Sequence, residues 1–250
     1  MTQYLLMPIA APMQSWGDMV VSGDDRPSLP FPTHSGLAGM ICAALGIDRK
    51  DGEQLRQVHD YLCFVVAQVN AGAMWHDFYT VRNVVRATGG TDGAIVGRKF
   101  YLADALFLVA VSAGQACPYT LKQIGHALLF PRFALYAGRR AYPLSLPPVC
   151  LENSAARMAE CENPVREMGT LLRNEETRRG LFYHHPLADQ PVSELRFYVE
   201  SGEAGAFGLS GDVPLIPHTV RDRYHGRYRS WGYREFDERD VLCIHFPTEE

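Results

Sequence analysis

Short runs of consecutive hydrophobic residues predict several buried strands along the 250-residue chain. A run of four to eight apolar residues bounded by turn residues is typical of a strand that is covered on both faces. Such runs occupy Tyr4–Ala11, Leu62–Val69 and Ala103–Ser112, and the later segments Leu195–Glu200 and Val241–Phe246 also favour strands. Pro8 has no amide hydrogen, so it indicates a sheet edge or a bulge in the first strand.

Helical segments are predicted between these strands. The first begins with Thr33 or Ser35 as its N-cap and ends at Gly46, because glycine tolerates the left-handed backbone that stops a helix. The second covers Pro118–Leu129 and carries its apolar residues on one face. A third is predicted at Pro164–Arg173, inside a long stretch of mixed charge.

The segment between the second and third strands has the pattern of a long hairpin arm. Two strand-like halves flank the glycine-rich turn 89–93, and the second half ends near Tyr101. From Arg82 to Lys99 there are four basic residues and one acid, Asp92. An arm of this kind reaches beyond the core toward a partner, and a disordered loop with solvated charges is the alternative.

The order of elements predicts an α+β fold. Strand, helix, strand, arm, strand and helix, completed by Leu195–Glu200, give the βαββαβ ferredoxin-like arrangement that RNA-recognition (RRM-like) domains share. We expect a core formed by residues 1–69 and 102–250, with an irregular C-terminal extension, and an inserted β-hairpin formed by residues 70–101. The Ser145–Val192 stretch is interpreted as an insertion.

Composition narrows the class of protein. The chain is 47% hydrophobic with a net charge of −4 and a pI of about 6.1, so a polyanion must be bound by a local patch. Six scattered cysteines without a Cys-x-x-Cys pair indicate reduced thiols and neither a disulfide framework nor a zinc site. The beginning of the chain lacks the pattern of a signal peptide, and no apolar run is long enough to cross a bilayer. We therefore expect a soluble cytoplasmic protein with no cofactor and no metal.

A basic and aromatic stretch, Phe130–Pro143, is the main candidate for ligand binding. It alternates three arginines with three aromatic residues around one glycine: Arg132, Phe133, Tyr136, Gly138, Arg139, Arg140 and Tyr142. No acid occurs between Asp104 and Glu152, whereas four bases do. Arginine pairs with phosphate and aromatic rings stack on unpaired bases, so the stretch favours nucleic acid. The alternative is an ordinary loop whose arginines pair with acids elsewhere.

Two segments near the N-terminus add candidates. The turn Met13–Gly17 carries an amide, a hydroxyl and an indole at Gln14, Ser15 and Trp16, which suit contacts with a nucleotide, unless Trp16 fills the core beneath the strand. His34 stands at the start of the first helix, where a catalytic or base-contacting histidine is possible and an ordinary polar loop residue is the alternative.

The C-terminal region is a second basic and aromatic segment. Between Pro217 and Arg234 five arginines accompany one acid, Asp222, and four aromatic residues, and an acidic stretch follows. RNA contact and a salt-bridged terminal hairpin both fit this pattern.

Known enzyme signatures are absent. The chain has no phosphate-binding P-loop, no Gly-x-Gly-x-x-Gly, no His-Glu-x-x-His and no Gly-x-Ser-x-Gly. Metal-independent cleavage of RNA needs a general base and a general acid. His34, Lys122 and Tyr136 have suitable side chains, and the sequence alone does not bring them together.

Three segments in register resemble the CRISPR-associated CasD family of the RAMP superfamily. They are the N-terminal strand with Met13-Gln14-Ser15-Trp16-Gly17, the run Pro32-Thr33-His34-Ser35-Gly36-Leu37-Ala38-Gly39-Met40, and Pro131-Arg132-Phe133-Ala134-Leu135-Tyr136-Ala137-Gly138-Arg139-Arg140. The resemblance covers residues 1–47 and 95–147, and 150–195 corresponds to nothing in it.

This resemblance implies a ferredoxin-like core with a protruding β-hairpin thumb, here Asn70–Tyr101. It implies a non-catalytic subunit of the type I-E ribonucleoprotein complex Cascade, active in antiviral defence. Such a subunit caps the 5′ handle of crRNA, contacts the backbone subunit and the large subunit, and has target DNA nearby. Some relatives instead cleave precursor crRNA, so a metal-independent endoribonuclease is the alternative function.

The residues expected to contact RNA come from both lines of reasoning. The implied contacts are Gln14, Ser15, Trp16, Arg26, His34, Ser35, Arg98, Lys99, Arg132, Tyr136, Gly138, Arg139 and Arg140. No catalytic residue and no metal ligand is expected.

Overall fold

The computed structural model describes residues 2–17, 25–85, 88–150, 158–192, 194–200, 215–224 and 236–247. The strands are β1 Thr2–Ala10, β2 Met13–Gln14, β3 Trp16–Gly17, β4 Ser28–Leu29, β5 Leu62–Asn70, β6 Ala73–Val85, β7 Thr91–Ala103, β8 Leu106–Ala113, β9 Met158–Cys161, β10 Glu194–Glu200, β11 Leu215–Tyr224 and β12 Phe236–Pro247. The helices are α1 His34–Leu45, α2 Gly52–Tyr61, α3 Leu121–Leu129, α4 Pro164–Arg173 and α5 Glu175–Leu181, with a 3-10 turn at Pro186–Ala188.

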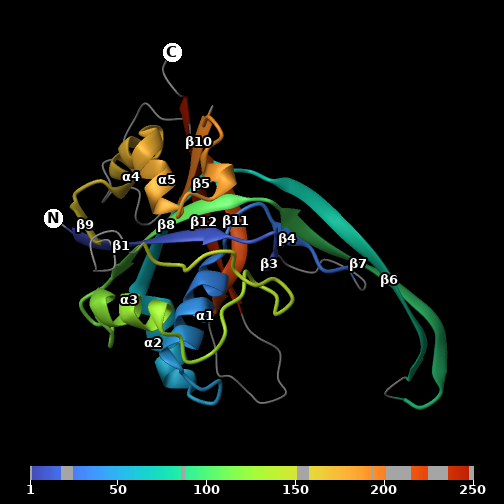
Figure 1. Ribbon diagram of the computed structural model, residues 1–250. Coiled ribbons are helices and arrows are strands. Elements are labelled where there is room, and N and C mark those ends of the chain that lie inside the picture. The colour runs from blue at the N-terminus through green and yellow to red at the C-terminus, as the bar shows by residue number, and fades with distance from the viewer. Residues whose placement is uncertain are drawn as a thin grey trace.

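A seven-stranded antiparallel sheet forms the centre of the molecule (Figure 1). Its strand order is β11-β12-β10-β5-β8-β1-β9. The three strands predicted from apolar runs, β1, β5 and β8, are adjacent and interior. Pro8 is paired with β8 in register but lies beyond Leu5, the last β1 residue that β9 pairs. Its missing amide hydrogen therefore falls where β1 has a single neighbour.

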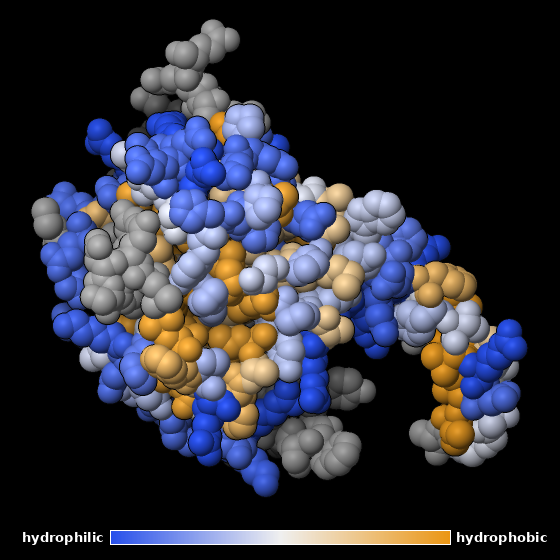
Figure 2. Space-filling model, in the orientation of Figure 1, coloured by the Kyte–Doolittle hydropathy of each residue, from blue (hydrophilic) through white to orange (hydrophobic). Residues whose placement is uncertain are grey.

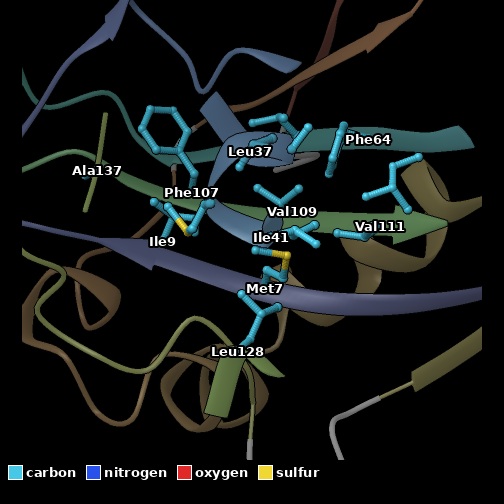
Figure 3. Packing of buried hydrophobic residues seen from close by; sticks show 14 of the residues in the cluster. Met7, Ile9, Leu37, Ile41, Phe64, Phe107, Val109, Val111, Leu128 and Ala137 are labelled. Carbon is cyan, nitrogen blue, oxygen red and sulfur yellow. The ribbon is translucent and has the colours of Figure 1, made fainter. Parts of the chain in front are cut away.

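Both faces of the sheet are covered, which explains the uninterrupted apolar runs. On β8, Phe107, Val109 and Val111 point to one core, and Leu106, Leu108 and Ala110 point to the other. Figure 3 shows the first core, where residues of α1 and α3 pack on β1 and β8. The second core lies under α4 and α5. Alternation of side chains across a strand places every second residue in each core.

The helix ends follow the local chemistry. Thr33 is the N-cap of α1 and its hydroxyl accepts a hydrogen bond from the Gly36 amide, and Gly46 closes the helix with a φ of 79°. The α3 helix starts at Leu121, three residues later than predicted from Pro118, because Thr120 and Gln123 form a reciprocal capping box. The predicted helix Pro164–Arg173 is confirmed as α4.

The predicted hairpin arm is confirmed. β6 and β7 pair one to one from Ala73↔Ala103 to Val85↔Thr91 and extend well away from the sheet (Figure 1). Gly89 and Gly90, both with φ near +85°, lie in the turn. The alternative of a disordered loop is wrong for the described residues, because the two halves form a regular antiparallel ladder.

Leu195–Glu200 forms a strand, as predicted. The prediction that it is the last strand of the βαββαβ arrangement is wrong, because it does not lie next to β1. β10 pairs with β5 and β12, while β9 is the strand that flanks β1 on the side away from β8. The four-residue β9 has too short a pattern to be predicted. The expected last strand Val241–Phe246 is confirmed within the longer β12, which pairs with β11.

Candidate nucleic-acid interface

Segments that lie far apart in the sequence meet at the base of the arm. The Ser15 amide donates to the Ala137 carbonyl at 3.0 Å, which joins the β2–β3 turn to the loop that contains Gly138. The segment around Arg26 pairs with β7, since the Arg26 amide donates to the Arg98 carbonyl at 2.7 Å and the Arg26 carbonyl accepts from the Phe100 amide at 2.9 Å. The β2–β3 turn, the Gly138 loop, the Arg26 segment and the base of β7 are the four candidate segments that meet in this region.

Gly138 is required by packing within the chain. Its φ is +86°, and a Cβ built there would overlap the Ser15 carbonyl oxygen and lie 2.8 Å from the Ser15 carbonyl carbon. The loop around it is closed by the Ala137 amide on the Tyr142 carbonyl at 2.8 Å. The absence of a side chain at position 138 therefore serves the close packing of this loop against the β2–β3 turn of the same chain.

The two arginines after Gly138 have different surroundings. The half-buried Arg139 donates from Nη2 to the Arg26 carbonyl at 3.1 Å and from Nη1 to the Tyr142 hydroxyl at 3.4 Å. Its guanidinium carbon lies 5.8 Å from the centre of the Tyr142 ring. Arg140 is exposed, and its side chain makes no ion pair with the residues that the structure describes. Arg139 fastens the loop to the arm base, and Arg140 is the arginine that remains available to a phosphate.

The arm base supplies further cations. Arg98 and Lys99 are adjacent on β7 and exposed, so their side chains leave opposite faces of the hairpin. The Lys99 ammonium lies 4.7 Å from the centre of the Tyr79 ring, a cation–π contact that holds it on one face. Arg26 is also exposed, with Nη1 3.2 Å from the Asp25 carbonyl oxygen. These three cations and Arg140 form the outward part of the candidate interface.

Gln14, Ser15 and Trp16 lie beneath this surface. Gln14 donates to the Ala105 carbonyl at 2.6 Å and accepts from the Trp16 indole at 3.1 Å. Trp16 is completely buried, and a Cβ at Gly36 would lie 2.9 Å from its ring. The alternative that Trp16 fills the core agrees with this burial. Direct contact of these three side chains with a nucleotide is not supported, because they are buried and their polar groups have partners within the chain.

His34 is also inside the protein. Its Nδ1 lies 2.7 Å from Glu200 Oε1, and its Nε2 lies 2.8 Å from the His59 carbonyl oxygen. The side chain is 0% exposed, so it does not reach a ligand at the surface. The neighbouring Ser35 is half-buried, and its hydroxyl has no hydrogen-bond partner among the described atoms. The Gly36 amide is already bonded to Thr33 at 3.2 Å, so it is not free for a phosphate.

Arg132 and Tyr136 complete the expected set. Arg132 lies at the opposite end of α1, where its amide donates to the Ala44 carbonyl at 3.0 Å, and the structure does not bring it to the arm base. Tyr136 is half-buried and forms an isolated bridge with Pro143 at the root of the Gly138 loop. Of the C-terminal arginines, Arg221 and Arg223 fall on β11, and the others lie outside the described residues.

Sequence reasoning missed two supporting residues. Asp25 accepts from the Arg98 amide at 2.8 Å through Oδ1 and so fixes the base of β7. Tyr101 lies with its ring 6.0 Å from that of Tyr142, and desolvation, followed by the charge of Asp77, raises the pKa of its phenol. Asp25 and Arg98 are 73 positions apart, so no local pattern in the sequence indicates their contact.

Among the described residues, no group of three or more His, Cys, Asp or Glu side chains is arranged to hold a metal ion. None of the helices in the described ranges has the length and hydropathy that a bilayer crossing requires.

The arm, the basic rim at its base and the buried support below define an antiparallel α/β protein with a candidate nucleic-acid interface. The family model described as "CRISPR-associated protein (Cas_Cas5)" matches residues 4–224. The chain therefore belongs to this family of CRISPR-associated proteins. It is 33% identical over 206 residues to the CRISPR system Cascade subunit CasD of Escherichia coli (strain K12), covering 78% of this chain and 91% of that protein. The predicted family membership is confirmed.

Solved structures show the same relationship. A chain of a structure described as "CRISPR RNA-guided surveillance complex" matches with a TM-score of 0.66 and 28% identity, over 98% of this chain and 91% of that one. Another, described as "Crystal structure of Cas protein", matches with a TM-score of 0.61 and 25% identity, over 98% and 95% of the two chains.

Proposed function

We propose that the chain is a non-catalytic RNA-binding subunit of a type I CRISPR interference complex, Cascade, in which it binds crRNA and caps its 5′ handle. The observation that carries this proposal is that the exposed cations Arg26, Arg98, Lys99 and Arg140 surround the base of the arm in a member of this family. A single-stranded RNA hook is held by arginine–phosphate pairs and by stacking of its bases on aromatic rings or guanidinium planes, and the arginines around the arm base can serve in both ways.

The arm is proposed to extend this contact to a neighbouring backbone subunit. Trp75 and Phe78 are 59% and 66% exposed on its two faces, and Val85 near its tip is 77% exposed. A two-stranded hairpin alone is marginally stable in water, so apolar side chains on both faces favour an arm that is covered in the complex. The large subunit is proposed as a second protein neighbour, with target DNA nearby.

The ferredoxin-like core is proposed with a corrected last strand. β1, α1, β5, β8, α3 and β9 follow the βαββαβ order, and the strand order β9-β1-β8-β5 supports this assignment. β10, β11 and β12 then extend the sheet beyond β5. Residues 70–101 remain our proposal for a separate arm unit, with the rest of the chain as the core.

The buried position of His34 supports a binding role over cleavage of precursor crRNA. The test is a binding titration of the purified chain with crRNA bearing its 5′ handle and with the same RNA lacking it. We expect handle-dependent binding that Arg140→Ala weakens, while Arg166→Ala, an exposed arginine on α4 across the sheet, leaves it unchanged. Equal affinity for both RNAs would contradict handle capping. Cleavage of precursor crRNA in EDTA that His34→Ala abolishes would support the endoribonuclease.

A further inference from the structure

Phe130 and Phe133 form an exposed aromatic corner far from the arm. Their side chains are 72% and 52% exposed. The other exposed large hydrophobic side chains in the described ranges lie on the arm, apart from Met13, which pairs with β7 at its base. Large apolar side chains left in water next to one another usually mark an interaction site. Figure 2 shows apolar surface over α3 and the loop that follows it.

The backbone of this corner is fixed. The amides of Arg132 and Phe133 donate to the carbonyls of Ala44 and Ala43 at 3.0 and 3.2 Å, so the loop is bonded to the last turn of α1, where the Ala43 carbonyl also accepts from the Gly46 amide. The aliphatic part of Arg132 rests on the turn that ends α1, where a Cβ at Gly46 would lie 2.6 Å from Arg132 Cγ. The aromatic side chains are therefore presented on a rigid support.

The chain segment that carries the corner contains bases and no acids. From Ala105 through Leu151 the sequence contains no acid. Arg132 is exposed, and its side chain makes no ion pair with any residue that the structure describes. The corner thus combines two apolar groups with one cation that has no carboxylate partner within the described chain, and a carboxylate on another molecule would complement it.

The corner is separate from the proposed RNA interface. Trp16 packs on Gly36 at the beginning of α1, and Arg132 packs on Gly46 at its end. A helix of 12 residues is about 18 Å long, so the two sites lie at opposite ends of that length. The cations suited to phosphates gather at the first end, whereas one arginine accompanies two phenylalanines here. Aromatic residues with arginine are the composition of protein-interface hot spots.

We propose that Phe130, Arg132 and Phe133 dock a neighbouring protein subunit of the same ribonucleoprotein complex. The surface that they fit has an apolar centre and a carboxylate placed to pair with Arg132. The proposal rests on the proposed function in taking the chain to be part of such a complex, and it reassigns Arg132 from RNA to protein contact.

The test uses the complete complex, produced by co-expression of all its protein subunits with crRNA. Three forms are compared: the unchanged chain, Phe130→Ala with Phe133→Ala, and Arg132→Glu, with Arg166→Glu on α4 as the charge control. Native mass spectrometry gives the subunit composition, and titration of the released subunit gives its affinity. Thermal unfolding of each isolated chain checks its fold, which the phenylalanine changes should preserve because both rings are exposed.

We expect both corner variants to lose one protein subunit, with at least about tenfold weaker affinity, while crRNA stays bound. Unchanged composition and affinity would overturn the inference. A matching loss of crRNA affinity by the isolated corner variants would also overturn it, since the corner would then contact RNA. If the unchanged chain fails to bind handle RNA at all, the proposed function fails, and that result is seen before any corner variant is compared.

Discussion

Substitution of Gly138 by alanine tests whether the basic loop depends on its contact with the β2–β3 turn. The added methyl group would overlap the Ser15 carbonyl oxygen and lie 2.8 Å from the carbonyl carbon, and both are backbone atoms that no side-chain rotation can move. The φ of +86° adds strain for any residue with a Cβ. The loop must therefore move away from Ser15.

The expected loss in the free energy of unfolding of Gly138→Ala has two parts. Left-handed backbone costs a residue with a Cβ roughly 1–2 kcal/mol. Separating the loop from the turn removes the 3.0 Å hydrogen bond from the Ser15 amide to the Ala137 carbonyl, which contributes about 1 kcal/mol. The free energy of unfolding should therefore fall by about 2–3 kcal/mol. For a chain of this size, that lowers the Tm by on the order of 5–10 °C.

Thermal unfolding and handle-RNA binding should be measured on the same preparations. Gly39→Ala is the matched control, because a Cβ at Gly39 in α1 would meet nothing within 4 Å. That change should leave RNA affinity unchanged and raise stability by up to about 1 kcal/mol. Gly138→Ala should lower the Tm and weaken handle binding about tenfold, since Arg140 moves with the loop.

Equal Tm and equal RNA affinity for Gly138→Ala and the unchanged chain would refute the packing argument. A lower Tm with full RNA affinity would refute a narrower point, that the position of the loop governs the interface.

Further predictions concern charge, the buried histidine and a thiol. Arg140→Ala should weaken handle binding and reduce the slope of log affinity against log salt by about 1, whereas Arg139→Ala should lower the Tm by removing the fastening to the arm base. His34→Ala should lower the free energy of unfolding in urea by about 2–4 kcal/mol, because it removes the hydrogen bonds of a buried imidazole to Glu200 and to the His59 carbonyl, and RNA should stay intact. Burial raises the pKa of the Cys42 thiol from 9.0 to about 12. The contribution of this thiol to stability should therefore be fully present below pH 9 and be lost as the pH rises toward 12. Iodoacetamide at pH 8 should modify Cys42 only in urea.

Local patterns predicted the elements well. The three interior strands were visible because both faces of the sheet are covered, which leaves no polar position along Leu106–Val111. The stop of α1 at Gly46 was visible because one residue determines it. The arm was visible from two strand-like halves around a glycine-rich turn.

Pairing between distant segments was not predictable from these patterns. The segment Leu195–Glu200 reads as a strand from its alternation, but alternation does not say whether it adds beside β1 or beside β5. β9 has only four residues, so its sequence pattern is too short to predict that it pairs with β1.

Sequence patterns have the same limit at the interface. There, one motif contains both residues that hold the chain together and residues that are exposed to a ligand. Gly138, Arg139 and Trp16 were proposed as contacts because of their chemistry, and the structure uses each of them to hold one segment of the chain against another. Arg140 has the same chemistry as its sequence neighbour Arg139, but its side chain is exposed. Whether a residue faces outward or supports the loop depends on the segment that packs beneath it. Here that segment is the β2–β3 turn, more than 120 positions away in the sequence. Variants of the outward residues should therefore change RNA affinity at constant stability, and variants of the supporting residues should change both.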